Sequence, residues 1–156
     1  MSGTIEARLT EKGITLPNAA APAGNYVPYV VSGTLVFISG QLPLVDGRPE
    51  FNGRLGESVS LEDGQRAARL CGLNLIAQLK AACGGDLDRV TRVVRLGGFV
   101  NSAADFTDQP KVINGASDLM VEVFGEAGKH ARAAVGAPTL PLGVSVEIEG
   151  TFEIKG

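Results

Sequence analysis

The sequence is poor in the residues that build most metal and redox sites. Its 156 residues contain one histidine, His130, two cysteines, Cys71 and Cys83, and no tryptophan. This set does not form a familiar zinc-binding pattern, and the cysteine spacing is not that of a C-x-x-C redox motif. We therefore expect no metal and no organic cofactor, and a chain with so few cysteines is typical of the reducing cytoplasm.

Long apolar runs and an excess of positive charge are also missing. No stretch approaches the roughly 20 apolar residues of a transmembrane helix. The N-terminus alternates charged and apolar residues and lacks the apolar core of a signal peptide. The formal net charge is −3, and we find no cluster of basic and aromatic residues. A membrane or nucleic-acid partner is therefore not expected.

The overall composition indicates one globular domain. Hydrophobic residues make up 44% of the chain and charged residues 20%, which are ordinary globular values. Because no repeat or linker divides the sequence, we expect a single domain over residues 1–156. Residues 1–23 form its N-terminal extension, with a short helix over 4–12. A modest core of small aliphatic residues leaves room for an oligomer to bury more surface.

Apolar periodicity predicts two long helices. In the first, over 60–83, apolar residues recur every three or four positions, and Ser60 with Asp63 resembles a capping box at its start. The second helix covers 109–124, with Asp108 as its candidate cap. Both helices end at glycine, which tolerates the left-handed conformation.

Strand patterns fill most of the remaining sequence. Residues 26–31 and 34–39 are expected to form a hairpin, and residues 42–58 a long irregular connection rich in glycine and proline. A further strand is expected over 90–100. Strict alternation of apolar and polar residues predicts the last strand, over 144–154. This order predicts an α+β fold, an α/β sandwich in which two long helices cover one face of a mixed sheet.

Arg132 is the first candidate for chemistry. It lies in the segment HARAAVGA, where small neighbours would leave a hollow around the side chain. A guanidinium in such a hollow suits a planar carboxylate, which it can bind with two hydrogen bonds. The alternative is an ordinary salt bridge or subunit contact. We interpret the nearby His130, expected in a loop, as a surface residue.

Two glutamates form the second candidate group. Glu147 and Glu149 are two residues apart on the last strand, so both carboxylates lie on its polar face. That face is either exposed to solvent or covered by another subunit, in which case a carboxylate could position or deprotonate a water molecule. The sequence leaves both options open. Tyr26, Ser39 and Asn114 are weaker polar candidates, and Cys71 is interpreted as a core residue.

Several segments taken together resemble the RidA/YjgF family, also called the L-PSP endoribonuclease family. The resemblance covers residues 24–154 in order and spacing. It implies a chorismate-mutase-like fold, homotrimers with clefts between subunits, and hydrolysis of reactive enamines and imines such as 2-aminoacrylate to a 2-keto acid and ammonia. The segments that carry it are GNYVPYVV, FISGQLPL, LKAACGGDLDRV, RLGGFVNSAADF, KVINGASDLMVEVF and ARAAVGAPTLPLGVSVEIEG.

The resemblance also implies roles for individual residues. The family arginine that pairs with the substrate carboxylate corresponds to Arg132, and the glutamate associated with the attacking water corresponds to Glu147. Tyr26, Ser39 and Asn114 correspond to the polar residues of the family's pocket. The chain departs from the archetype in having Ala134 in place of a cysteine, a different segment over 135–139 and a longer connection over 42–58.

Three functions are consistent with these observations. The first is a cytoplasmic deaminase of small 2-imino acids, which the presence of both Arg132 and Glu147 favours. The second is a non-catalytic trimer that binds a small carboxylate as a sensor or modulator, and it would need Arg132 but not Glu147. The third is a ribonuclease or translation inhibitor, which the acidic net charge disfavours.

Overall fold

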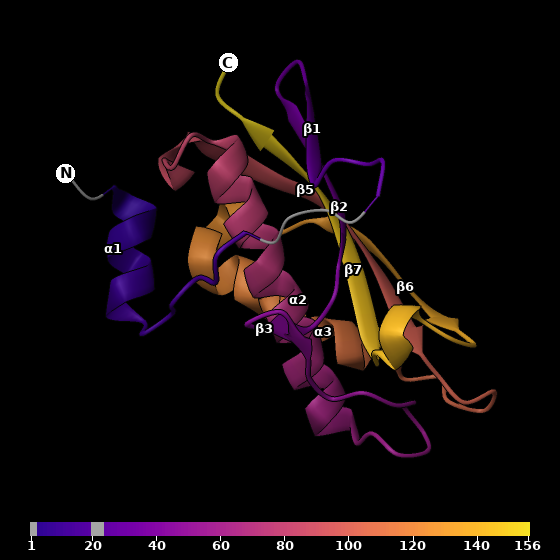
Figure 1. Cartoon of the computed structure of the whole chain (residues 1–156). Helices are drawn as coiled ribbons and strands as arrows, with labels where there is room; N and C mark the ends of the chain where they lie inside the picture. Colours follow the sequence, from indigo (N-terminus) through magenta and orange to yellow (C-terminus); the bar gives the residue numbers. More distant parts are fainter. Residues whose placement is uncertain (1–2, 20–23) are drawn as a thin grey trace.

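The chain forms a mixed sheet with helices on one face in the computed structural model, which describes residues 3–19 and 24–156. Figure 1 shows α2 and α3 along one side of the sheet and α1 farther out. The helices are α1 (Thr4–Glu11), α2 (Leu61–Ala82) and α3 (Gln109–Phe124), with 3-10 turns η1 (Leu87–Arg89), η2 (Gly125–Gly128) and η3 (Pro141–Gly143). The strands are β1 (Tyr29–Ser32), β2 (Leu35–Gln41), β3 (Leu44–Val45), β4 (Arg48–Pro49), β5 (Val90–Asn101), β6 (Ala131–Ala137) and β7 (Val146–Ile154).

The main sheet has the strand order β1-β2-β7-β5-β6. Strands β5 and β6 are parallel, whereas the other neighbours are antiparallel. The predicted hairpin, the strand β5 and the strand β7 are confirmed. The connection over 42–58 is more ordered than expected, since β3 and β4 form a small antiparallel ribbon within it.

Strand β6 corrects the expectation that Arg132 lies in a loop, whereas His130 lies in the loop just before the strand, as expected. The strand sequence ARAAVGA has a single β-branched residue, Val135, and no aromatic residue, so its strand propensity is low. It becomes a strand because it pairs with β5 from Arg95↔Ala131 to Asn101↔Ala137. Small side chains fit this edge position, and their pairing depends on β5 rather than on local propensity.

The caps of the long helices agree only in part with the sequence analysis. Ser60 caps α2 as expected, because its Oγ accepts a hydrogen bond of 3.1 Å from the Asp63 amide. The Asp63 carboxylate does not close a capping box and instead forms an ion pair of 2.8 Å with Arg66. Asp108 occupies the N-cap position of α3, as expected, but its side chain forms no capping hydrogen bond and its carboxylate lies 3.7 Å from Lys111 Nζ.

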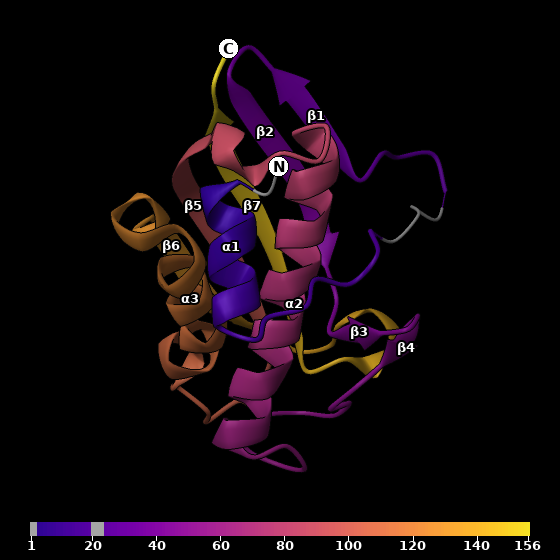
Figure 2. The same cartoon turned by 90° about the vertical axis from the view of Figure 1, so that its left-hand side faces the viewer.

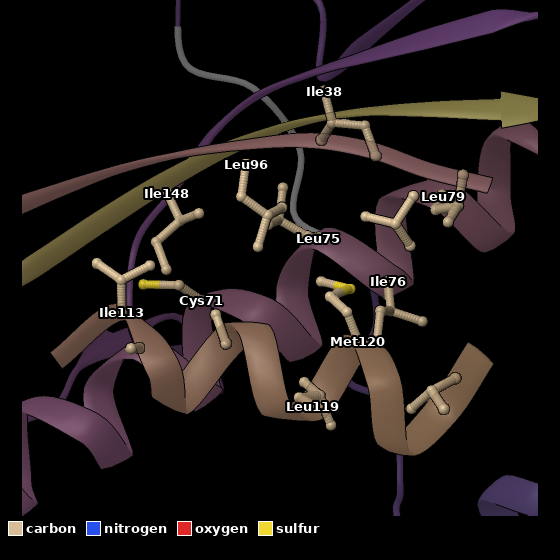
Figure 3. Close-up of a cluster of buried hydrophobic side chains, with 14 of the residues drawn as sticks. Ile38, Cys71, Leu75, Ile76, Leu79, Leu96, Ile113, Leu119, Met120 and Ile148 are labelled. Atoms are coloured by element: carbon tan, nitrogen blue, oxygen red, sulfur yellow. The ribbon is translucent and has the colours of Figure 1, made fainter. Parts of the chain in front are cut away.

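The core lies between the sheet and the pair α2 and α3 (Figure 3). Cys71 is fully buried there, as the sequence predicted. Two glycines allow the layers to approach closely. A Cβ at Gly98 of β5 would collide with Ile113 of α3, and one at Gly115 of α3 would collide with the Gln65 carbonyl of α2. These contacts fix α3 against both the sheet and α2.

The N-terminal helix α1 confirms the expected short helix and covers α2 and α3 from outside (Figure 2). Its first turn is capped by Asp88 of η1, whose carboxylate accepts hydrogen bonds from the amides of Thr4 (2.8 Å) and Ile5 (2.9 Å). Residues 1–2 and 20–23 of the expected N-terminal extension lie outside the described residues. Within the described ranges, no helix is long and apolar enough to cross a membrane.

Candidate functional site

Arg132 points into the helix layer from the start of the edge strand β6. Its partner across β5 is Leu96, which is buried on the helix side of the sheet. Arg132 Nη1 donates hydrogen bonds to Asn114 Oδ1 (2.8 Å) and Ser117 Oγ (3.1 Å). Both acceptors belong to α3, where residues three apart lie on one face. The helix therefore holds the guanidinium by one nitrogen.

A second hydrogen-bonded pair supports this arrangement. His130 Nε2 lies 2.9 Å from Ser117 Oγ, and His130 Nδ1 lies 2.6 Å from the Gly128 carbonyl oxygen. Because a carbonyl oxygen can only accept, Nδ1 carries a proton. In the neutral ring Nε2 then accepts from the Ser117 hydroxyl. His130 lies at the surface, as interpreted from the sequence, but its ring is partly buried and hydrogen-bonded to α3.

The four side chains line a cavity of about 290 Å³ at the surface of α3 and β6. The sequence analysis attributed a hollow around Arg132 to the small residues of its own segment. The structure shows that the wall comes mainly from polar residues of α3 and from the residues before β6. Besides Asn114, Ser117, His130 and Arg132, the lining residues are Asp118, Val121 and Lys129.

Glu147 lies on the opposite face of the sheet. Glu147 of β7 is in register with Phe99 of β5, which in turn is in register with Val135 of β6. Val135 is 47% exposed on this outer face. Glu147 is half-buried, whereas Glu149 is exposed. Burial raises the pKa of the Glu147 carboxyl, and the nearby Glu149 raises it further. A raised pKa makes this carboxylate a better proton acceptor than an ordinary glutamate.

An irregularity in β2 places further candidates beside Glu147. The register between β2 and β7 shifts between Ile38 and Gln41. In this stretch Gly40 lies so close to Glu147 Oε2 that a Cβ there would collide with it. Ser39 Oγ donates a hydrogen bond of 2.8 Å to the Val27 carbonyl, which ties the segment containing the exposed Tyr26 to the same region.

The candidate residues therefore fall into two groups. The inner cluster consists of Asn114, Ser117, His130 and Arg132 on the helix side of the sheet. The outer cluster consists of Tyr26, Ser39 and Glu147 on the other side.

One chain cannot bring both clusters to one small ligand. Strand β5 lies between β6 and β7, so Arg132 and Glu147 are two strand spacings apart, about 10 Å. The β6 residue in register with Glu147 is Val135, which lies about 10 Å along the strand from Arg132. The two side chains also point to opposite faces of the sheet.

Sequence reasoning missed Ser117 and the role of His130. The three-residue spacing of Asn114 and Ser117 on a predicted helix could have indicated that both face Arg132. The contact with His130 depends on the 3-10 turn η2, which no local pattern indicates.

A second hollow involves a side chain that is already engaged. Arg54 lines a cavity of about 360 Å³, and its guanidinium donates to Asn101 Oδ1 (3.2 Å) and to the Pro138 carbonyl (2.7 Å). In the described residues, no group of three or more His, Cys, Asp or Glu side chains is placed to hold a metal ion.

The fold and the inner cluster define a class of small α+β protein with an arginine-centred site beside an edge strand. The family model described as "YjgF/chorismate_mutase-like, putative endoribonuclease" matches residues 6–149. The chain belongs to this family. The resemblance to the RidA/YjgF family and the expected chorismate-mutase-like fold are confirmed.

Three proteins are similar to this chain over nearly its whole length. Protein TCP17 of Trypanosoma cruzi is 53% identical over 99% of this chain and 96% of its own length. The structure of Atu1372 from Agrobacterium tumefaciens, a protein of unknown function, is 51% identical and has a TM-score of 0.90, covering 97% of this chain and 92% of that one. A structure from Shewanella oneidensis, named as a putative endoribonuclease, is 41% identical with a TM-score of 0.93, covering 97% and 100%.

Proposed function

We propose that the protein hydrolyses small reactive 2-imino acids and their enamine tautomers to 2-keto acids and ammonia. The observation that carries the proposal is the way Arg132 is held. Within the described residues, its two hydrogen bonds to α3 both come from Nη1, so Nη2 and Nε remain for a ligand. A guanidinium fixed in this way beside a cavity suits the planar carboxylate of such a substrate.

The reaction needs little beyond positioning and one proton acceptor. The imine carbon is already electrophilic, so a water oxygen can bond to it while Glu147 accepts a proton from that water. Glu147 returns this proton to the nitrogen, which gives a carbinolamine. The new hydroxyl group then passes its own proton to the nitrogen through the same carboxylate, the carbon–nitrogen bond breaks, the carbonyl of the 2-keto acid forms and ammonia leaves. The balance is one imino acid and one water in, one 2-keto acid and one ammonia out. No metal or organic cofactor takes part in this scheme.

The proposal requires two copies of the chain for each site, and we assign them to a homotrimer. The outer face of the sheet carries exposed apolar side chains, with Phe37 44% and Val135 47% exposed. Strand β6 is also an open edge, which readily pairs or packs with another chain. If the β6 edge of one copy packs on the outer face of another, the Arg132 of the first comes toward the Glu147 of the second.

Cys71 and Cys83 are free thiols, both buried, as suits a cytoplasmic protein.

An assay of turnover tests the proposal directly. Iminopropionate is generated in the cuvette from alanine by an amino-acid oxidase, and its decay is followed with and without the protein. We expect faster decay, with pyruvate and ammonia released in equal amounts. Decay at the rate in buffer alone would overturn the deaminase proposal.

A second function is favoured by the completeness of the inner cluster. Because Asn114, Ser117, His130 and Arg132 form their network inside one chain, a carboxylate could bind there without Glu147. A protein that binds pyruvate but shows no turnover would be a small-carboxylate sensor or modulator. Endoribonuclease activity is disfavoured by the net charge of −3.

A further inference from the structure

Apart from the hydrogen bond by which Ser117 helps to hold Arg132, the pair Ser117 and His130 has no part in the reaction proposed above. We infer that these two residues are additional ligand-positioning groups whose hydrogen-bond direction couples carboxylate binding at Arg132 to protonation of His130. The inference rests on the proposed function only in that a carboxylate binds at Arg132. It predicts tighter binding of the anion at lower pH.

With His130 neutral, Ser117 cannot donate a hydrogen bond to a ligand. The Ser117 hydroxyl hydrogen points to His130 Nε2 at 2.9 Å, because Nδ1 donates to the Gly128 carbonyl. The same oxygen accepts a hydrogen bond from Arg132 Nη1. A bound carboxylate therefore faces a lone pair of the Ser117 oxygen, and two acceptors in contact repel each other.

Protonation of His130 reverses the hydrogen bond. Nε2 becomes a donor, and both lone pairs of the Ser117 oxygen then accept, one from His130 and one from Arg132. The hydroxyl hydrogen is released from the ring and becomes available to a ligand in the cavity that Ser117 lines. A carboxylate held by Arg132 gains a donor and a second positive charge nearby, and both changes favour binding.

Other charged groups lie near the same ring, and their effects on binding must be distinguished from that of His130. They are Asp118 on α3, Lys129 immediately before the ring, and Arg132 on β6. Lys129 Nζ forms an ion pair of 3.0 Å with Glu126. Ordinary aspartate, lysine and arginine side chains titrate outside the range in which histidine does, so they set the affinity but not its slope near neutral pH.

Linkage makes the coupling reciprocal. If protonation of His130 strengthens carboxylate binding, the bound carboxylate must favour the protonated ring of His130 by the same free energy. This consequence can be observed directly, because His130 is the single histidine of the chain. Its ring proton resonance in an NMR spectrum needs no assignment.

The experiment combines calorimetry and NMR with pyruvate as the probe. The affinity of the whole protein for pyruvate is measured between about pH 5.5 and pH 8.5, the range in which histidine titrates. Typical coupling between two sites is roughly 5- to 150-fold, and we expect about tenfold tighter binding at the acidic end. Saturating pyruvate should move the His130 titration to higher pH.

Two variants and one control assign the effect. His130→Asn keeps a donor for the Gly128 carbonyl but cannot titrate, so its affinity should not rise toward acid pH. Ser117→Ala removes the hydroxyl group that becomes a donor when His130 is protonated, and retains only the effect of the His130 charge. The pyruvate affinity of this variant should therefore change less with pH than that of the wild type. Asp118→Asn should change the affinity at every pH and leave the slope intact.

The outcomes separate this inference from the proposed function. Pyruvate binding with equal affinity across the range, or an unmoved His130 titration, overturns the inference and leaves the deaminase proposal standing. A rising affinity without turnover of iminopropionate supports the inference and overturns the deaminase. Absence of pyruvate binding at every pH overturns both.

Discussion

The two polar clusters on opposite faces of the sheet differ in how complete they are. The inner cluster around Arg132 is closed by hydrogen bonds within one chain. The outer cluster has Glu147 beside Gly40 and the exposed Glu149, on a face that carries exposed Phe37 and Val135. The carboxylate anchor is therefore preorganised by the fold of one chain, whereas the proposed proton acceptor needs a second copy to form a site.

This division follows from what each cluster is built on. Asn114 and Ser117 lie on α3, which is fixed where Gly115 meets the α2 backbone and Gly98 meets Ile113. Rigid support of this kind reduces the cost of ordering side chains when a ligand binds. Glu147 lies on a regular strand with one open face, so its surroundings depend on what covers that face.

The largest effect should come from charging the outer face. Val135→Glu places a carboxylate among the apolar side chains of the proposed subunit contact, on the same face as Glu147 of its own chain and separated from it by Phe99 of β5. We expect monomers in sedimentation equilibrium and imine decay at the buffer rate, while pyruvate binding by the inner cluster persists.

Val45→Glu is the matched control, because Val45 is 39% exposed but belongs to the β3–β4 ribbon. It should leave both assembly and turnover unchanged. A Val135→Glu protein that stays trimeric, or a monomer with full activity, would contradict the assignment of Glu147 to an intersubunit site.

The next effect concerns Glu147 itself. Glu147→Gln keeps the shape of the side chain but removes the proton acceptor, and loss of a positioned acid–base group costs about 10²-fold in rate. Pyruvate binding should be retained. Glu149→Gln is the control on the same face and should cost much less. Equal losses in the two variants, measured with iminopropionate, would show that Glu147 has no special role.

A smaller effect is expected at the anchor. Arg132→Lys keeps the positive charge but loses the fork that contacts Asn114, Ser117 and the ligand together. Hydrogen bonds to charged groups are worth roughly 1.5–3 kcal/mol, so the loss of one weakens pyruvate binding by about tenfold or more. Calorimetry gives the dissociation constant. Arg95→Lys, on the outer face, should bind pyruvate like the wild type.

The sequence predicted most of the fold because its signals there were local. The period of α2, its Ser60 cap and the alternation of β7 follow from residues within each element. Strand β6 could not be predicted this way, because its small residues form a strand only by pairing with β5. The prediction that the Asp63 carboxylate closes a capping box at the start of α2 was also wrong, because this carboxylate forms an ion pair with Arg66.

The site was predicted less completely for the same reason. Arg132 and Asn114 were identified, and the structure joins them by a hydrogen bond of 2.8 Å. Ser117 and His130 meet only because η2 turns the chain back toward α3. The separation of Arg132 from Glu147 depends on strand order and on which face each residue takes, and both are properties of the assembled sheet.

Long-range capping gives a prediction remote from both clusters. The Asp88 carboxylate accepts hydrogen bonds from the amides at the start of α1, and these bonds lower its pKa. Asp88→Ala should release the first turn of α1, so that the amides of Thr4 and Ile5 exchange faster with deuterium. Glu126→Ala, at an exposed position in η2, should leave this exchange unchanged. Unaltered exchange in Asp88→Ala would show that α1 does not depend on this cap.

The smallest expected effect concerns stability: the contributions of Glu147 and Asp88 to the free energy of unfolding should depend on pH with opposite signs. The pKa of Glu147 is raised in the folded chain, chiefly by burial. Below the ordinary glutamate pKa the carboxyl is protonated in both folded and unfolded states, and its ionisation costs the fold nothing.

As the pH rises through the raised folded pKa, the unfolded chain is already ionised and the folded chain must ionise a half-buried group. The wild type should therefore lose stability relative to Glu147→Gln over this window and stay lower above it. Asp88 has a lowered folded pKa, so its contribution is present above the ordinary aspartate pKa and is lost as the pH falls through the folded value. Urea unfolding of the wild type and of Glu147→Gln between about pH 3 and pH 8 measures the difference in their free energies of unfolding.

The same pair of measurements is repeated with Val135→Glu added to both proteins, and this tests the comparison between the clusters. A Glu147 that is covered by a second chain should show the larger pH dependence in the intact assembly. An equal difference in monomer and assembly would mean that the outer face is not covered at Glu147.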